Sequence, residues 1–315
     1  MQNKRKLYGY LAIITADILW GMSFVWTKEL LQNGIPVFTI LLGRMIVASS
    51  VLLLLFKITG KLENIRRKDF SLFFLLALFQ PFLYFIGENY GLKYASPSIG
   101  AAVVALVPVA QTLSLHLFYK ENIRATVFLG TAVSAIGIAI MSFSSQTADL
   151  SMKGLLLLLL AVVSAAMYGT ILQKILKKGY GPVTITTAQN MISIIYYLPC
   201  FLVFDLNTVT SLQWNAQSVI NILILGVLCS AGAFALYSTA AKLISVAGIA
   251  VFTNVIPVVT LAMSVLLGVE LLNVRKTVGI LIVIVGVLVS QFVFSGKKKS
   301  ETENKNLNIK ETKTN

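Results

Sequence analysis

The sequence has few charged residues, which occupy 12% of its 315 positions. A typical soluble domain carries about 25% charged residues. Here 57% of the residues are hydrophobic, and the mean hydropathy is +0.84. This composition excludes a soluble globular domain and predicts an integral membrane protein.

Cysteine is nearly absent as well. Cys200 and Cys229 both lie inside apolar runs, where cysteine behaves as a small hydrophobic residue. Neither a disulfide framework nor a metal site is therefore expected. The sequence also lacks a phosphate-binding loop and any pairing of a nucleophile with a base. We expect neither enzymatic activity nor a cofactor.

Acidic residues are scarce, with 12 Asp and Glu against 26 Lys and Arg, which gives a net charge of +14. A basic balance can indicate a nucleic-acid partner. In this chain, however, the basic residues lie in short clusters between apolar runs. That distribution is typical of membrane topology, so no nucleic-acid partner is expected.

Ten apolar runs have roughly the length needed to cross a bilayer, which is about 20 residues for a helix. Strands of a barrel are excluded, because they alternate over about ten residues and these runs are continuous. The expected spans are Leu7–Val25, Val37–Phe56, Phe70–Leu92, Ser98–Phe118, Thr126–Phe143, Leu155–Ile175, Val183–Phe204, Val219–Ala241, Val246–Val269 and Thr277–Phe294. The sequence therefore predicts an all-α integral membrane protein with ten transmembrane helices.

Lysine and arginine are distributed unequally between the alternate connections of these spans. With the N-terminus inside, 20 of them fall on the cytoplasmic side and five on the opposite side. Because positive residues are retained in the cytoplasm, we expect both termini there and the protein in the cell membrane, with the lipid bilayer as its partner. Leaving out the lysines beyond Lys299 gives 17 against five and the same orientation.

One stretch of the chain, Lys93 to Gly137, recurs without a gap from Lys242 to Gly286, at a shift of 149 positions. The matched residues have special backbone or charge behaviour, which chance similarity between apolar segments would not select. They are Lys93 and Lys242, Ser96 and Ser245, Ala101 and Ala250, Pro108 and Pro257, Val109 and Val258, Leu117 and Leu266, Glu121 and Glu270, Gly130 and Gly279, and Gly137 and Gly286. In addition, Trp20-Gly21 matches Tyr168-Gly169 at a shift of 148.

This duplication divides the chain into two repeats of five spans each, residues 1–148 and 149–296. Because each repeat holds an odd number of spans, the second repeat is expected to enter the membrane in the opposite orientation. The repeats would then be inverted and would surround a central cavity. Residues 297–315, rich in Lys, Glu, Asn and Thr, are expected to form a disordered cytoplasmic tail.

These motifs resemble those of the drug/metabolite transporter superfamily, EamA type, over Leu7–Phe294. The resemblance is carried by Trp20-Gly21-Met22-Ser23-Phe24, Arg44, Asn89-Tyr90-Gly91-Leu92-Lys93-Tyr94-Ala95-Ser96, Pro108, Glu121, Gly130, Gly137 and the second copy through Gly286. It implies a central cavity lined mainly by the first, third, fourth, sixth, eighth and ninth spans, with the fifth and tenth packed together elsewhere. It also implies transport of small organic molecules, often export of amino acids or related metabolites, without a required oligomer.

Two prolines, Pro108 and Pro257, fall in the middle of spans at equivalent places in the two repeats. A proline removes a backbone donor and frees a carbonyl one turn earlier. Interrupted helices in corresponding positions are a pointer to a midplane site and its gate. We interpret this pair as hinges, whereas Pro81 and Pro199 have no counterpart and are interpreted as structural kinks.

Three charged residues stand out within the expected spans, where a charge costs about 2.5 to 3.5 kcal/mol on insertion scales. Asp17 is near the centre of the first span, Arg44 in the second and Glu88 in the third. All three are candidates for ion coupling or ion pairing, and a hydrogen bond to a neighbouring helix is the alternative for Asp17. Arg44 and Glu88 lie at overlapping depths, and a structural ion pair or a shared water network would explain them. The other hypothesis is that Glu88 is the ionisable centre of the site, with protons as the coupling ion.

Polar and aromatic residues on the expected lining spans are candidate substrate ligands. They are Trp20, Ser23, Gln80, Tyr84, Glu88, Asn89, Gln111, Tyr168 and Asn254. Gln80, Tyr84 and Glu88 are spaced by four and share one helical face. Tyr237, Tyr196 and Tyr197 lie near span ends, where aromatic residues are more often interfacial anchors. The single histidine, His116, is interpreted as an interface residue.

Small residues give the fifth span a narrow face, formed by Gly130, Ser134 and Gly137. Gly279 and Gly286 repeat this face in part in the tenth span. Such faces allow two helices to approach closely. Close packing accounts for them without a functional role.

The sequence thus favours a secondary transporter of small organic metabolites that works by alternating access. The alternative is a non-transporting membrane scaffold or sensor, in which polar residues within spans would be incidental. The duplicated proline and the intramembrane acids favour the transporter, because a scaffold needs neither.

Overall fold

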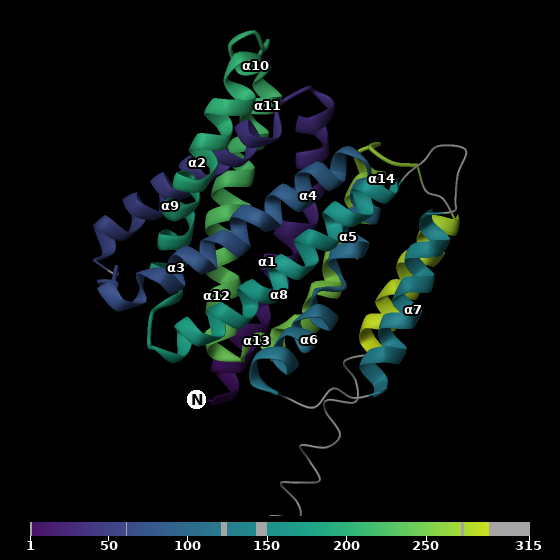
Figure 1. Cartoon of the computed structure of the whole chain (residues 1–315), viewed down its shortest axis with the longest axis horizontal. Helices are drawn as coiled ribbons and strands as arrows, with labels where there is room; N and C mark the ends of the chain where they lie inside the picture. The colour runs from purple at the N-terminus through teal and green to yellow at the C-terminus, as the bar shows by residue number, and fades with distance from the viewer. Residues whose placement is uncertain (1, 61, 121–124, 143–149, 272–273, 290–315) are drawn as a thin grey trace, which may run out of the picture.

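The computed structural model describes residues 2–60, 62–120, 125–142, 150–271 and 274–289. These residues fold almost entirely into helices that pack into one bundle (Figure 1). The described part of the chain contains no strand, and one isolated bridge joins Ala95 to Leu150. The expected tail over residues 297–315 and the repeat residue Glu121 lie outside the described residues.

The helices of the first half follow the expected spans closely. They are α1 (Gln2–Gln32), α2 (Val37–Thr59), η1 (Arg67–Asp69), α3 (Phe70–Ala77), η2 (Leu78–Leu83), α4 (Tyr84–Lys93), α5 (Pro97–Val104), α6 (Val107–Tyr119) and α7 (Ala125–Ser142). The third expected span is divided into α3, η2 and α4, and the fourth into α5 and α6.

The second half is also helical, with more interruptions. Its elements are α8 (Met152–Lys177), α9 (Pro182–Cys200), η3 (Phe201–Asp205), α10 (Leu206–Thr210), α11 (Ala216–Ile224), η4 (Leu225–Ala233), α12 (Phe234–Leu243), α13 (Val246–Ile249), η5 (Ala250–Asn254) and α14 (Val255–Leu266). A last helix covers residues 274–289.

Seven helical stretches of the described residues are long and apolar enough to cross a membrane. They are Lys4–Gln32, Val37–Phe56, Arg67–Lys93, Pro97–Phe118, Met152–Lys177, Pro182–Thr210 and Ala216–Leu243. The apolar helices Phe128–Ile140 and Phe252–Leu266 are shorter. Length and composition therefore support fewer spans than the ten expected. In the ninth expected span the reason is a 3-10 helix, η5, which divides it.

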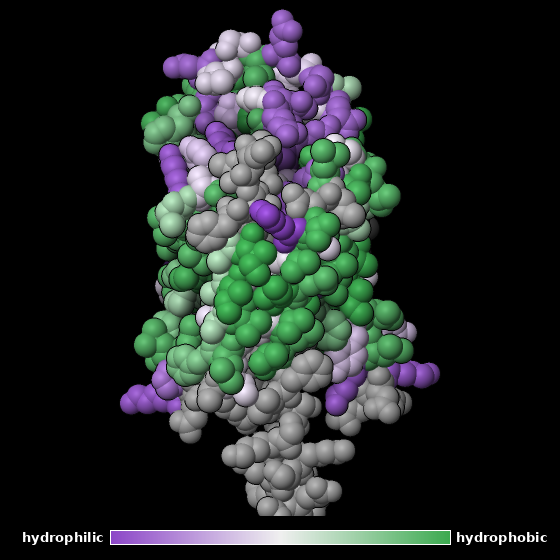
Figure 2. All heavy atoms as spheres, turned by 90° about the vertical axis from the view of Figure 1, so that its right-hand side faces the viewer, coloured by the Kyte–Doolittle hydropathy of each residue, from purple (hydrophilic) through white to green (hydrophobic). Residues whose placement is uncertain are grey.

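The outer surface carries the signature of a membrane protein. Figure 2 shows a broad belt of hydrophobic residues between two more hydrophilic ends. Several large hydrophobic side chains, including Phe128, Ile136 and Leu281, are more than half exposed. A continuous apolar surface of this size would be unstable in water. The chain is therefore a multi-pass membrane protein.

Local capping explains where two of the helices begin. The side chain of Ser151 accepts a hydrogen bond from the backbone N–H of Gly154 at 3.1 Å and so caps α8. Asn215 caps α11 in the same way, by accepting from the N–H of Ser218 at 2.7 Å. Such caps satisfy backbone donors that a helix leaves unpaired in its first turn.

Helix packing follows a reciprocal pattern. α4 packs on α8, and α12 packs on α1; α14 packs on α1, and α6 packs on α8. α2 and α9, which occupy equivalent places in the two halves, pack on each other. The contact of α4 with α8 thus corresponds to that of α12 with α1, and the contact of α14 with α1 corresponds to that of α6 with α8, because equivalent helices of the two halves take the same roles. Reciprocal contacts of this kind are the mark of a two-fold relation.

The helix α7 and the helix over residues 274–289 stand side by side at one edge of the bundle (Figure 1). A Cβ on Gly137 would lie 2.7 Å from the carbonyl oxygen of Gly279, and a Cβ on Gly286 would lie 2.6 Å from that of Gly130. Gly137 of α7 meets Gly279, and Gly130, earlier in α7, meets Gly286, later in the other helix. The two helices are therefore antiparallel. Close packing at the glycines, as expected from the sequence, is confirmed.

We predict that Gly137→Ala destabilises the protein by about 1 to 3 kcal/mol, the usual cost of overpacking a tight contact. The added methyl group would meet backbone atoms of the partner helix at 2.7 and 2.8 Å, and these cannot move aside as a side chain can. Thermal unfolding in detergent, monitored by size-exclusion chromatography, measures the change.

The matched control is Gly232→Ala, since a Cβ at Gly232 meets its nearest atom at 3.4 Å, an ordinary contact. This variant should unfold at the temperature of the unmodified protein or slightly above it. Equal thermal stability of both variants and the unmodified protein would contradict the close-packed interface.

Candidate functional site

Helix interruptions gather at the centre of the bundle. In η2, Gln80 has non-helical backbone angles, with φ of −148° and ψ of 123°. α5 ends at Val104 and α6 begins at Val107, so a turn separates them. In the second half, the 3-10 helix η5 connects α13 to α14. Backbone breaks at membrane depth are tolerated only inside protein or beside a water-filled cavity.

The break at Gln80 is stabilised from a neighbouring helix. The hydroxyl group of Tyr197, on α9, donates to the carbonyl oxygens of Pro81 and Phe82 at 2.8 and 3.1 Å. Tyr197 is fully buried, so its interpretation as an interfacial anchor was wrong. Pro81 does form a kink, as expected, but this kink also turns Gln80 toward the centre of the protein.

The two duplicated prolines lie at the second breaks of each half. Pro108 is the second residue of α6, and Pro257 is the third residue of α14. Each therefore follows the interruption instead of lying in the middle of a continuous helix. Proline is well suited to the first turn of a helix, where its missing N–H has no intrahelical acceptor. Their role as hinges stays a prediction.

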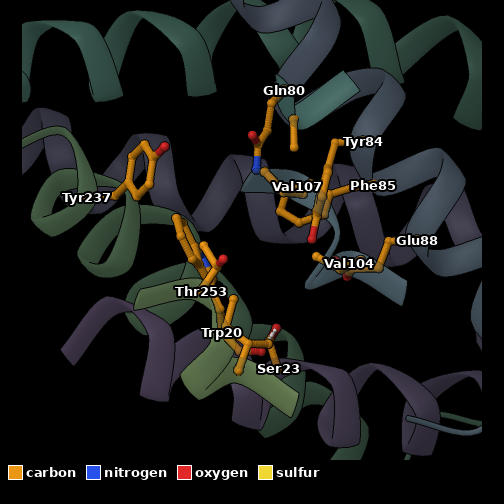
Figure 3. Close-up of a pocket in the computed structure, with 12 residues that line it drawn as sticks. Trp20, Ser23, Gln80, Tyr84, Phe85, Glu88, Val104, Val107, Tyr237 and Thr253 are labelled. Carbon is orange, nitrogen blue, oxygen red and sulfur yellow. Dashed lines mark hydrogen bonds between the residues drawn. The ribbon is translucent and has the colours of Figure 1, made fainter. Parts of the chain in front are cut away.

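A small cavity of about 40 Å³ lies among these breaks. Its lining residues come from α1, η2, α4, α5, α6, α8, α12, η5 and α14. They are Trp20, Ser23, Gln80, Tyr84, Phe85, Glu88, Val104, Val107, Ala165, Tyr237, Thr253 and Ile256. In Figure 3, Gln80, Tyr84 and Glu88 lie on one side of the cavity and Trp20 and Tyr237 on the other.

Five candidate ligands from the sequence reach this cavity. They are Trp20, Ser23, Gln80, Tyr84 and Glu88. The stripe of Gln80, Tyr84 and Glu88 keeps a common face although the helix is broken at its first member. The hydroxyl group of Tyr84 lies beside the carboxyl group of Glu88.

Four other candidates are buried but do not line the cavity. Asn89 is fully buried, and the amide group of Gln111 donates to Thr170 on α8 at 3.0 Å. The hydroxyl group of Tyr168 donates to Gln189 on α9 at 3.2 Å. Asn254 is also buried, directly after the lining residue Thr253. Gln111 and Tyr168 therefore connect helices in this structure.

Five of the seven lining residues that sequence inspection missed or set aside have a common signal, the internal repeat; Phe85 and Ala165 are the other two. Glu88 and Tyr237 are related by the shift of 149 positions. The same shift relates Val104 to Thr253 and Val107 to Ile256, so that three repeat-related pairs line one cavity. Applying the repeat to Glu88 would have selected Tyr237.

Trp20 and Tyr237 belong to an aromatic wall. The indole N–H of Trp20 donates to the carbonyl oxygen of Cys229 at 3.2 Å, which fixes the ring. Its ring centroid lies 5.2 Å from that of Phe234 and 5.4 Å from that of Tyr237. Tyr237 therefore packs within the bundle and is not an interfacial anchor.

Arg44 is fully buried behind the cavity. Its Nε donates to the hydroxyl group of Ser230 at 2.9 Å, and its Cζ lies 3.9 Å from the ring centroid of Phe85. Within the described part of the chain, neither terminal nitrogen of Arg44 makes a hydrogen bond, and Oε1 of Glu88 also has no hydrogen-bond partner. Arg44 and Glu88 thus interact through their charges without a direct bond.

Asp17 occupies a separate buried position on α1, close to one turn before Trp20. Its side chain is fully buried and does not line the cavity. Neither carboxyl oxygen has a hydrogen-bond partner among the described residues.

Comparison with known proteins identifies the family of this chain. The EamA-like transporter family matches residues 7–143 and 152–292. Among similar proteins, the uncharacterized transporter YdfC of Bacillus subtilis is 30% identical over 187 residues, which cover 58% of this chain and 59% of YdfC. An uncharacterized transporter of Archaeoglobus fulgidus is 25% identical over 86% of this chain and 94% of its own length.

The fold has a counterpart among solved structures. One crystal structure superposes with a TM-score of 0.67 at 15% identity, over 93% of this chain and 98% of the other. At that identity the likeness concerns the fold alone. The family match covers most of the chain in two segments. This chain therefore belongs to the EamA-like transporter family.

Proposed function

We propose that this protein is a secondary transporter of small organic metabolites that works by alternating access around the central cavity. Ten passages through the membrane, arranged as two inverted repeats over residues 1–148 and 149–296, form the transport unit. The reciprocal helix packing and the antiparallel contact of α7 with the helix over residues 274–289 support this arrangement. Amino acids or related metabolites, exported from the cell, are the solutes that the family resemblance implies.

The observation that carries the proposal is the composition of the cavity wall. Three pairs of residues related by the repeat shift, beginning with Glu88 and Tyr237, face the same cavity. A cavity shared in this way lies on the axis that relates the halves. If the two halves exchange conformations, the access path moves from one side of the membrane to the other while the site stays in place.

Broken helices beside the cavity supply the places where such a change can occur. The interruptions at Gln80, at Ala105–Leu106 and in η5 all lie next to lining residues. A hinge needs only a few residues at element ends that absorb a change in backbone angles. The alternative of a scaffold or sensor requires neither a cavity with polar groups nor a buried acid.

A vesicle experiment tests the function. Purified protein is reconstituted into liposomes loaded with an extract of water-soluble metabolites, and mass spectrometry measures which solutes are lost. Ala165→Trp should block the cavity, because Ala165 lines it. The control is Val163→Trp on the same helix, because Val163 is 56% exposed and does not line the cavity. If a solute leaves protein-free vesicles, or vesicles with the Ala165→Trp variant, as fast as it leaves vesicles with the unmodified protein, that solute does not pass through the cavity. If every solute behaves this way, the proposal is wrong.

The orientation is a further part of the proposal and yields the first prediction here. Because Lys and Arg divide 20 to five between the two sides, we predict that Asn33 and Asn207 face the outside and Asn64 the cytoplasm. All three side chains are exposed. Single cysteines are placed there in a background without Cys200 and Cys229, and intact cells are treated with an impermeant thiol reagent. Labelling of the cysteine at position 64 in intact cells would contradict the inverted arrangement.

The second prediction concerns the hinges. Pro108→Ala and Pro257→Ala should fold and insert normally but slow transport by about tenfold, equal to about 1.4 kcal/mol in the barrier. Replacing proline lets the helix continue through the break and stiffens it. Pro199→Ala, within α9 and without a counterpart, is the control and should transport normally. Unchanged rates in both single variants and in the double variant show that these prolines are only structural.

The third prediction concerns Glu88 as a carrier of coupling protons. The ionisable groups near Glu88 are Arg44, Tyr84, Tyr197 and Cys229. Glu88→Gln mimics the neutral carboxyl group. We expect this variant to lose accumulation driven by a pH gradient but still to exchange solute across vesicles when the solute is present at saturating concentration.

The opposite outcome identifies a structural role. If Glu88 only compensates Arg44, Glu88→Gln leaves a buried charge without its counterpart, which typically costs 3 to 5 kcal/mol. The folded yield would then fall and would recover when Arg44→Gln is added. Normal gradient-driven accumulation in a well-folded Glu88→Gln protein also eliminates proton coupling at this residue.

A further inference from the structure

The charge of the cavity wall is one-sided. Of the twelve residues that line the cavity in the described part of the chain, Glu88 alone belongs to a charged type. The remaining polar groups are the side chains of Ser23, Gln80, Thr253 and the two tyrosines. Hydroxyl and amide groups can orient a solute, but they do not balance a full negative charge. The wall therefore offers an anionic group and no cationic one.

Aromatic rings make up much of the same wall. Trp20, Tyr84, Phe85 and Tyr237 all line the cavity. The rings of Trp20 and Tyr237 lie 5.4 Å apart, and those of Tyr84 and Phe85 lie 5.2 Å apart. The face of an aromatic ring attracts a cation within about 6 Å of its centroid. A carboxylate combined with several rings is suited to a positively charged nitrogen.

The nearest buried cation is not available to a solute in this structure. Arg44 is fully buried and is absent from the lining, and its guanidinium group lies over the ring of Phe85. A solute with a carboxylate would have to displace that ring to reach it. A zwitterionic amino acid would leave its own carboxylate in the cavity beside Glu88, where like charges repel.

We propose that the cavity selects small organic cations, namely amines without a carboxylate group, over zwitterions, anions and neutral analogues. Glu88 binds the positive nitrogen, and Trp20 and Tyr237 surround it from the opposite side. This inference rests on the proposed function, because it names the class of solute that the transport site takes. It narrows the solutes implied by the family resemblance to amines related to amino acids.

Four probes with one common skeleton test the class of solute. Phenethylamine is a cation, phenylalanine adds a carboxylate, 3-phenylpropanoate is an anion and 2-phenylethanol is neutral. Binding is measured by calorimetry on the full-length protein in nanodiscs, with protein-free nanodiscs correcting for partition into lipid. We expect phenethylamine to bind saturably and at least tenfold more tightly than each of the others, a difference of about 1.4 kcal/mol.

Variants locate the binding. Glu88→Gln should weaken phenethylamine at least tenfold and leave 2-phenylethanol unchanged. Tyr237→Leu, which keeps an apolar side chain but removes the ring, should weaken phenethylamine several-fold and gives a second test if Glu88→Gln folds poorly. The matched control is Glu29→Gln, the same loss of charge at a residue outside the cavity that accepts a hydrogen bond from Asn221 at 3.0 Å. It should bind all probes normally.

Three outcomes overturn the inference: phenylalanine or 3-phenylpropanoate binding as tightly as phenethylamine, 2-phenylethanol doing so, or no saturable binding of phenethylamine at millimolar concentration. The vesicle experiment separates this failure from that of the proposed function. If vesicles release anions or zwitterions through the cavity, the proposed transport function is supported and only the proposed selectivity for organic cations is wrong. If no solute leaves through the cavity, the proposed function falls too.

Discussion

A carbonyl oxygen released by a helix break has no water to bind in the hydrocarbon core of a bilayer, so another part of the protein must satisfy it. This constraint explains the centre of the molecule. The hydroxyl group of Tyr197 donates to the carbonyl oxygens at the break in η2, and the indole N–H of Trp20 donates to the carbonyl oxygen of Cys229 in η4. The break in η2, which turns Gln80 toward the cavity, is thus stabilised by a donor from a neighbouring helix.

The backbone of the bundle is more symmetric than its chemistry. Helices pack in reciprocal pairs, and the cavity is lined from equivalent positions of both halves. At one such pair, however, the first half has Glu88 and the second has Tyr237. The helix packing is thus equivalent in the two halves. The replacement of an acid by an aromatic ring at this pair gives the cavity a carboxyl group on the side of the first half only. In the proposed transport cycle, the symmetric helix packing allows the two halves to exchange conformations, and the difference between Glu88 and Tyr237 selects the solute.

Charge burial sets a second limit on the site. Glu88 and Arg44 are both fully or almost fully buried, yet the ring of Phe85 lies against the guanidinium group and no direct bond joins the two charges. Each charge lowers the cost of the other by its field alone, since Coulomb interactions are strong at low dielectric. The carboxyl group of Glu88 lines the cavity, and in the proposed transport cycle it is the group that meets a solute or a proton.

The sequence by itself determined the helical membrane fold, the internal repeat, the close contact at Gly137 and Gly286, and the helical face that carries Glu88. Composition, periodicity and backbone-specific residues act locally and leave a readable pattern. Only the tertiary structure decided that Tyr237 lines the cavity, that Gln111 and Tyr168 instead connect helices, and that Arg44 is shielded from the cavity. These outcomes depend on how each helix is rotated against neighbours distant in sequence, and the hydrophobic pattern cannot fix that rotation when both lipid and protein interior are apolar.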